Sequence, residues 1–87
     1  MYYVYVISDK EGEIYIGYTN DLERRISEHN SSKNVGYTRN QKWQYVYYEA
    51  YTSKIDAILR EKRLKSHGQS KRQLKARIQE SLKIRDN

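Results

Sequence analysis

Residues 2–29 read YYVYVISDKEGEIYIGYTNDLERRISEH, and this stretch contains the pattern that decides the fold. Its first segment, 2–8, is rich in β-branched and aromatic residues, which is typical of a strand. A polar turn ending in Gly12 follows, and the segment 13–18 has the composition of a second strand. Because the link between the two segments is short, the sequence predicts an antiparallel hairpin.

A helix is expected directly after the hairpin. Asn20 is predicted to cap its free N–H groups, with Glu23 three residues later as the other half of a capping box. At 100° per residue, Arg25 and His29 fall within about 60° of Leu22, so they share the apolar face. We therefore expect Arg25 either to meet a buried carboxylate or to border a site that receives an anion. The alternative is an arginine whose stem packs while its guanidinium reaches water.

The hairpin also concentrates tyrosine on one face. Side chains alternate along a strand, so Tyr3 and Tyr5 share a face of the first strand, and Tyr15 and Gly17 share a face of the second. A loop with an odd number of residues would place Tyr5 opposite Tyr15, with the two hydroxyls converging. Gly17 inside a strand indicates a bulge, or the close approach of a ligand or another backbone. Tyrosine is also a good strand residue, so most of the ten tyrosines are expected to be structural.

The rest of the chain continues the pattern. A polar loop at 31–42 precedes a third strand at 43–50, and Ser53 or Thr52 is expected to cap a second helix that ends near residue 66. Gly68 is a helix-stop signal, and a basic last helix is predicted at about 70–83. The apolar stripe of the second helix is predicted to be Ile55, Ile58 and Leu59, and that of the last helix Leu74, Ile78 and Leu82.

The order β-β-α-β-α-α predicts an α/β (α+β) fold, a small, mostly antiparallel three-stranded sheet flanked by helices. With 87 residues, the chain is expected to form one domain over residues 1–87. The absence of cysteine excludes a disulfide framework and a cysteine-based metal site. No apolar run has the length of a membrane span, and the N-terminus does not resemble a signal peptide. We expect a soluble, cytoplasmic protein.

Charge is distributed unevenly along the chain. Residues 1–59 contain seven Lys/Arg and eight Asp/Glu, a net charge of −1, whereas residues 60–87 contain ten and three, a net charge of +7. This asymmetry favours a polyanionic partner, nucleic acid first and an anionic membrane second. The alternative explanation is a solvated helix face that serves only solubility.

Glu61 is the only acid in the basic run REKRLK at 60–65. It is interpreted either as an ion-pair partner of a neighbouring cation or as a metal ligand. A single inward carboxylate, with substrate phosphates completing the shell, suits Mg²⁺, which keeps several of its waters.

Taken together, these residues resemble a known family. The triplets YVY at 3–5 and YIG at 15–17 are separated by nine residues, and TNDLERRISEH at 19–29 and AILREKRLK at 57–65 follow them. The chain resembles the GIY-YIG nuclease superfamily over roughly residues 2–66, especially its small standalone members, and is similar to the nuclease domain of the UvrC excision protein. Tyr3 stands where the first family motif has glycine.

The resemblance implies a role for each of five residues. Tyr15 corresponds to a motif tyrosine that deprotonates or aligns the attacking water, and Tyr5 to one that orients the water or the phosphate. Arg25 corresponds to an arginine that stabilises charge developing on the phosphate. His29 corresponds to a histidine that assists proton transfer or binds a phosphate oxygen. Glu61 corresponds to the ligand of one Mg²⁺ or Mn²⁺ ion.

The implied function is that of a metal-dependent endonuclease that hydrolyses phosphodiester bonds in nucleic acid, DNA favoured over RNA, in DNA repair or processing. The rival is a non-catalytic nucleic-acid-binding module that retains the nuclease scaffold, since stacking and phosphate contacts need no metal. A membrane-surface helix at 70–85 is less well supported, because its apolar stripe is narrow and lacks Trp and Phe. Backbone contacts to nucleic acid are expected from Arg24, Tyr37, Arg39, Lys62, Lys65, Lys71 and Arg72.

Overall fold

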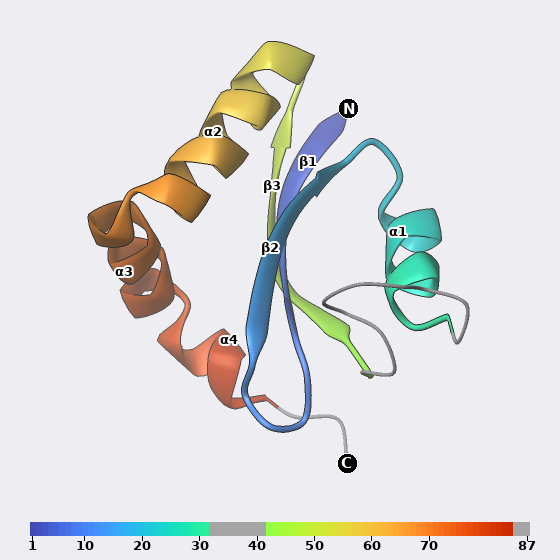
Figure 1. Cartoon of the computed structure of the whole chain (residues 1–87), viewed down its shortest axis with the longest axis vertical. Helices are drawn as coiled ribbons and strands as arrows, with labels where there is room; N and C mark the ends of the chain where they lie inside the picture. Colours follow the sequence, from blue (N-terminus) through green and yellow to red (C-terminus); the bar gives the residue numbers. More distant parts are fainter. Residues whose placement is uncertain (32–41, 85–87) are drawn as a thin grey trace.

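The computed structural model of the chain describes residues 1–31 and 42–84 (Figure 1). Its three strands form one antiparallel sheet in the order β2-β1-β3, which confirms the predicted α+β class and element order. The described helices number four, one more than expected. The elements are β1 (Tyr2–Ser8), β2 (Ile14–Thr19), α1 (Leu22–His29), β3 (Gln44–Tyr51), α2 (Lys54–Ser66), α3 (Gly68–Arg77) and α4 (Gln79–Lys83).

The sheet separates two cores. Figure 1 shows α1 on one side of the sheet and α2, α3 and α4 on the other. On the α2 side, Val4 and Val6 of β1 pack with buried side chains of α2 and α3 and with Ile78, which lies between α3 and α4. On the α1 side, Tyr5 and Ile7 of β1 pack with Trp43. Since successive side chains of a strand point to opposite faces, the central strand supplies both cores.

The register of the hairpin corrects one expectation. Tyr5 pairs with Gly17, and Ile7 pairs with Tyr15, so Tyr5 does not lie opposite Tyr15. The loop does have an odd number of residues, 9–13, but the pairing is shifted by two positions from the expected one. Because the shift is even, Tyr5 and Tyr15 still share a face of the sheet.

The hairpin loop explains this register. Asp9 is buried, and its Oδ1 accepts hydrogen bonds from the backbone N–H groups of Glu11 and Glu13, each at 2.9 Å. Gly12 has a φ of 88°, a left-handed conformation that glycine adopts at little cost. The carboxylate and the glycine together hold a five-residue loop and fix where the second strand begins.

Gly17 serves a purpose that the sequence did not predict. A Cβ built on this residue would lie 2.5 Å from Cζ and 3.0 Å from Cε2 of Tyr5. The pairing of β1 with β2 is uninterrupted, whereas the irregularity in the sheet lies between Val6 and Ile7, on the β3 side. Gly17 therefore makes room for the tyrosine ring of the neighbouring strand, and it does not mark a bulge.

The first helix begins one residue later than expected. Asp21 is the N-cap, and its side chain accepts a hydrogen bond from the backbone N–H of Arg24 at 3.0 Å. Thr19 holds Asp21 in place, because its Oγ1 accepts from the Asp21 N–H at 3.1 Å. Asn20 instead accepts from the Arg24 guanidinium, so the predicted capping box with Glu23 is wrong.

The buried face of α2 also differs from the prediction. Its buried residues are Ala57 and Leu64, and Glu61 lies half-buried between them at the i+4 position from Ala57. The predicted apolar stripe points outward instead, with exposed fractions of 69% for Ile55, 38% for Ile58 and 57% for Leu59.

The C-terminal segment forms two helices where one was predicted. Gly68 begins α3, and the break at Ile78 has φ −108° and ψ 28°. Leu74 and Ile78 are buried as expected, and the change of direction at Ile78 allows Leu82 of α4 to pack on the same core. Across the parts of the chain that the structure describes, none of the helices has the length and apolar character needed to cross a bilayer.

Candidate active site

The candidate site is centred on the hydroxyl of Tyr5, which lies completely buried in the middle strand. This oxygen accepts a hydrogen bond from Arg25 Nε at 3.1 Å and lies 2.8 Å from His29 Nε2. Arg25 and His29 are one turn apart on α1, so both reach the same strand residue. The structure thus confirms that these two side chains share one face of the helix. We call Tyr5, Arg25 and His29 the Tyr5 cluster.

The protons of the Tyr5 cluster follow from its environment. Burial, and then the nearby Arg25 cation, lower the pKa of His29 to about 4, so the imidazole is neutral at pH 7. Burial raises the pKa of Tyr5, although the hydrogen bond from Arg25 opposes this effect, so the phenol stays protonated. Arg25 can only donate, and the single Tyr5 proton is then directed at His29 Nε2. This arrangement gives the Tyr5 hydroxyl both a donor and an acceptor.

Hydrogen bonds hold one edge of the Arg25 guanidinium, and another edge faces solvent. Its Nη1 donates to Glu28 Oε1 at 2.9 Å, and the bond to Tyr5 is the main cause that raises its pKa further above the ordinary arginine value. The Arg25 side chain is 36% exposed, and its Nη2 has no partner among residues 1–31 and 42–84. The structure therefore places a permanent cation, already oriented, at the border of solvent. Its carboxylate partner is the exposed Glu28 rather than a buried acid.

Tyr15 brings the second strand into the same site. Its ring centroid lies 5.2 Å from that of His29, in an edge-to-face arrangement. The ammonium of Lys65 lies 5.2 Å from the centroid of the Tyr15 ring, within the range of a cation–π contact. The rings of Tyr5 and Tyr15 therefore both contact His29 from one face of the sheet, and the convergence of their hydroxyls stays a prediction.

Lys65 connects this aromatic group to α2. Its Nζ lies 3.2 Å from Glu61 Oε2, a pair one helical turn apart. The Glu61 side chain is 23% exposed, and its charge is one of the smaller influences on the pKa of Tyr5, after burial and Arg25. Groups from β1, β2, α1 and α2 thus lie close enough to interact electrostatically. Lys65 is one of the neighbouring cations, with Arg60 and Lys62, that the sequence offers to Glu61 as an ion-pair partner, and the structure confirms that pair. The sequence also predicts Lys65 as a contact to a nucleic-acid backbone.

The residues present fit a single divalent cation. Within the described ranges, no group of three or more His, Cys, Asp or Glu is placed to hold a metal ion. Glu61 offers one carboxylate, whose Oε1 bonds to no residue in the described part of the chain. Mg²⁺ and Mn²⁺ favour oxygen ligands, and Mg²⁺ is commonly held by one or two carboxylates, substrate phosphates and water.

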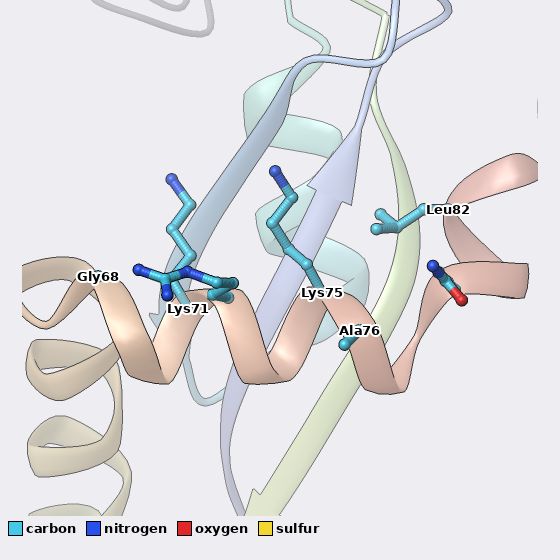
Figure 2. Close-up of a pocket in the computed structure, with 7 residues that line it drawn as sticks. Gly68, Lys71, Lys75, Ala76 and Leu82 are labelled. Atoms are coloured by element: carbon cyan, nitrogen blue, oxygen red, sulfur yellow. The ribbon is translucent and has the colours of Figure 1, made fainter.

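Basic side chains extend from the site along α3. Lys65 and Lys71 line a pocket of about 340 Å³ with Tyr15 at the β2 edge of the sheet. Lys71 also lines a groove of about 620 Å³ on α3 and α4, together with Arg72 and Lys75. Figure 2 shows Lys71 and Lys75 leaving α3 side by side. Lys71 therefore joins the groove to the pocket beside Tyr15.

The remaining predicted contact residues lie elsewhere. Lys62 is exposed on α2. Arg24 is exposed on α1 and is engaged by Asn20 and Glu28. Tyr37 and Arg39 lie outside the described residues.

Sequence reasoning missed three residues that shape the site. Lys75 extends the basic groove, and its i+4 spacing from Lys71 was the signal that would have identified it. Trp43 packs beside Tyr15 with a centroid distance of 6.5 Å. The Tyr45 hydroxyl donates to the backbone carbonyl of Leu22 at 2.7 Å, which ties α1 to the sheet, and burial raises the pKa of Tyr45 to about 12.

Comparison with known proteins gives consistent matches. Residues 1–75 match the family model described as the GIY-YIG catalytic domain. The chain is 37% identical over 73 residues to a UPF0213 protein of Haloquadratum walsbyi, covering 83% of this chain and 82% of the relative. It is 39% identical over 74 residues to a UPF0213 protein of Bacillus pumilus, covering 84% and 76%. The solution NMR structure of a UPF0213 protein from Bacillus halodurans is similar with a TM-score of 0.52 and 35% identity, covering 87% and 85% of the two chains.

Proposed function

From the premise that this chain belongs to the GIY-YIG family, we propose that it is a metal-dependent endonuclease that hydrolyses phosphodiester bonds in DNA. The observation that carries the proposal is the Tyr5 cluster, in which a buried tyrosine orients an arginine with an open edge. Glu61 and Tyr15 approach the same cluster from α2 and β2. Phosphodiester hydrolysis requires an anion-binding cation, a means of activating water and a metal ligand, and these five residues supply them.

Arg25 is assigned to the phosphate. Its free Nη2 and its exposed edge allow it to donate hydrogen bonds to a non-bridging phosphate oxygen. Because Tyr5 holds the guanidinium before substrate arrives, little reorganisation is needed as negative charge develops in the transition state. Tyr5 itself is fully buried, so it acts as a positioning residue and does not contact the substrate.

Tyr15 is assigned to the attacking water. It is half-buried at the edge of the sheet and lines a pocket with Lys65 and Lys71, so a water molecule and a phosphate can reach it. His29 is 2% exposed and has a pKa of about 4, which makes it a poor base at pH 7. His29 therefore positions Tyr5 through a hydrogen bond and packs against the ring of Tyr15.

Glu61 is assigned to the divalent ion. When bound there, Mg²⁺ or Mn²⁺ supplies positive charge that stabilises the leaving oxygen. Lys65 now neutralises Glu61 at 3.2 Å, so its ammonium must release this carboxylate, at least in part, when the site is loaded.

The basic groove on α3 and α4 is assigned to the nucleic-acid backbone. Lysine and arginine contacts to phosphate hold a strand without reading its sequence and weaken steeply with salt. We favour DNA over RNA as the substrate, and we assign the activity to DNA repair or processing. The same groove and tyrosines would serve a non-catalytic binding module, which is the alternative function.

The test is a cleavage assay with the purified full chain on supercoiled, single-stranded and branched DNA, with Mg²⁺ or Mn²⁺ and with chelator. We expect cleavage that requires the metal and is lost in Glu61→Gln, while binding of uncut DNA persists. Glu80→Gln is a matched control, because Glu80 is an exposed acid whose partner, Lys83, lies on α4. Absence of cleavage on every substrate, or equal rates in wild type and Glu61→Gln, would contradict the proposal, and binding without cleavage would favour the alternative.

A further inference from the structure

Two tyrosines next to the candidate site remain without an assigned role. Tyr3 of β1 and Tyr48 of β3 form an edge-to-face pair, with ring centroids 5.7 Å apart and an interplanar angle of 79°. Tyr48 pairs with Tyr5 across the sheet, and Tyr3 shares its face with Tyr5. The two rings, which we call the aromatic platform, therefore lie on the face that carries the Tyr5 cluster.

The aromatic platform is open on the side that α1 leaves uncovered. The core beneath α1 is built on Tyr5, Ile7 and Trp43, and in the described part of the chain it includes neither Tyr3 nor Tyr48. Tyr48 is 54% exposed, and Tyr3 is half-buried. Single exposed aromatic residues are ordinary on protein surfaces. A pair of them, adjacent to an oriented arginine, indicates a surface that receives a flat ligand.

The position of the aromatic platform narrows the class of ligand. Tyr3 is two residues from Tyr5 along the strand, a separation of about 7 Å. A group stacked on the platform thus lies close to an anion held by Arg25, whose Nε is bonded to Tyr5. A flat aromatic group covalently joined to a phosphate is a nucleotide. Base–tyrosine stacking is tolerant of sequence, because every base has a π-face.

Resting on the proposed function for the placement of the phosphate, we propose that Tyr48, with Tyr3 packed edge-to-face against its ring, stacks an unpaired nucleobase beside the phosphate bound at Arg25. Both faces of a base inside a continuous duplex are covered by its neighbours. The aromatic platform therefore selects single-stranded or locally unpaired segments over continuous duplex. An apolar side chain of another protein, or a second copy of this chain, is the competing occupant.

The experiment measures binding without cleavage. Fluorescence anisotropy in chelator compares a short single-stranded oligonucleotide with the blunt duplex of the same sequence, using the full chain. We expect Tyr48→Ala to weaken single-strand binding by about 5- to 150-fold, which corresponds to about 1–3 kcal/mol for the loss of one stacked base. Duplex binding should change little. Tyr48→Phe should bind single strands as the wild type does, because stacking requires the ring and not the hydroxyl.

Leu59→Ala is the matched control, since Leu59 is a large residue with a similar exposed fraction, 57%, on α2. Equal single-strand affinity in wild type and Tyr48→Ala would overturn the proposal, and so would equal weakening on single strand and duplex. A change in oligomeric state, seen by light scattering, without a change in DNA affinity would assign the platform to a second copy and also overturn it. If the platform binds single strands but the wild type never cleaves them, only the nuclease proposal fails. If the wild type cleaves while Tyr48→Ala binds normally, only the platform fails.

Discussion

Each face of the sheet carries an arginine in a cluster with tyrosine, and the two clusters differ in the group that neutralises the arginine. On the α2 side, Arg60 donates two hydrogen bonds to Glu49, at 2.9 and 3.0 Å. Tyr47 and Tyr51 donate to the same carboxylate at 2.6 and 2.5 Å. We call these four residues the Glu49 cluster. On the α1 side, the buried partner of Arg25 is the neutral phenol of Tyr5, and its carboxylate partner is the exposed Glu28.

The difference separates a structural arginine from a candidate catalytic one. Glu49 accepts four hydrogen bonds, which is about the full capacity of a carboxylate. Burial alone would raise its pKa, but the donors outweigh burial and lower it, so the acid is charged and satisfied. Arg60 gives two of its nitrogens to one half-buried carboxylate that neutralises it, whereas Arg25 gives its Nε to a neutral phenol and has only the exposed Glu28 as a carboxylate partner. Two arginines that look equivalent in the sequence thus differ in how far their charge is already neutralised.

The largest expected effect on stability comes from acidification, which should damage the two clusters in different pH ranges. His29 has a folded pKa of about 4 against an ordinary value of 6.5, so the unfolded chain binds more protons between these values. Stability is therefore complete above pH 6.5 and falls as the pH drops to 4, by up to about 3 kcal/mol. Glu49, whose pKa is lowered, should lose its contribution only as the pH falls below 4.5.

Urea unfolding at a series of pH values measures this dependence. His29→Gln should remove the slope between pH 4 and 6.5 and leave the loss at lower pH in place. An unchanged slope in the variant would show that other groups cause it.

A second test concerns how tightly the Tyr5 cluster is packed. In Gly17→Ala the new methyl group must displace the buried Tyr5 ring, so we expect a loss of about 1–3 kcal/mol in the free energy of unfolding, as for overpacked cores. Gly68→Ala is the control, because a Cβ there meets no atom within 4 Å, and it should be neutral or stabilising by up to about 1 kcal/mol. Equal denaturation midpoints for the two variants would contradict the packing role of Gly17.

The next test removes the cation of the Glu49 cluster. Arg60→Ala leaves a largely buried carboxylate without its charged partner, because the two side chains are 28% and 15% exposed. We expect a loss of about 1–3 kcal/mol, below that of a fully buried pair because water still reaches the arginine. Arg63→Ala, an exposed arginine on the same helix, should change stability far less. Similar unfolding curves for these two variants would mean that the Glu49 cluster does not hold α2 to the sheet.

The smallest expected effect on stability comes from removing one of the four hydrogen bonds to Glu49. Tyr51→Phe deletes the hydroxyl bonded to Glu49 and leaves Arg60 and Tyr47 in place. The loss should be about 0.5–1.5 kcal/mol in thermal or urea unfolding. A loss larger than that of Arg60→Ala would show that the tyrosines, rather than the arginine, dominate this cluster.

The strands, the order of the elements along the chain and the face of α1 that meets the sheet could be predicted from the sequence, because each has a local signal. Strand composition identified the three strands, and the 100° spacing placed Arg25 and His29 together. The buried face of α2 could not be predicted this way. Its inner positions are occupied by a small residue, Ala57, and by Glu61, while the large apolar side chain of Ile55 points outward. Apolar periodicity predicts instead that the large apolar side chains lie inside and the charged ones outside.

The function of Gly17 was hidden for a different reason. The strand pattern shows that a glycine is unusual there, but the cause is a ring on another strand, and identifying it requires the register. That register is set by Asp9 and Gly12 in the loop, which carry no signal that fixes the pairing to within two residues. The contact of Lys65 with Tyr15 likewise depends on how α2 lies against β2, whereas its ion pair with Glu61 follows from their i, i+4 spacing on one helix.

The central claim is that Arg25, whose charge is not neutralised by a buried acid, performs chemistry, and that Arg60, paired with the half-buried Glu49, holds the fold. The most direct measurement is the single-turnover cleavage rate of Arg25→Ala beside Arg60→Ala, at a temperature where both remain folded. Our account predicts that Arg25→Ala loses about 10²–10³-fold in rate, as expected for the loss of one charge-stabilising group, with a stability change within about 1.5 kcal/mol. Arg60→Ala should cleave nearly as fast as wild type. Cleavage by Arg25→Ala at the wild-type rate, or an equal fall in rate in both variants, would contradict the claim.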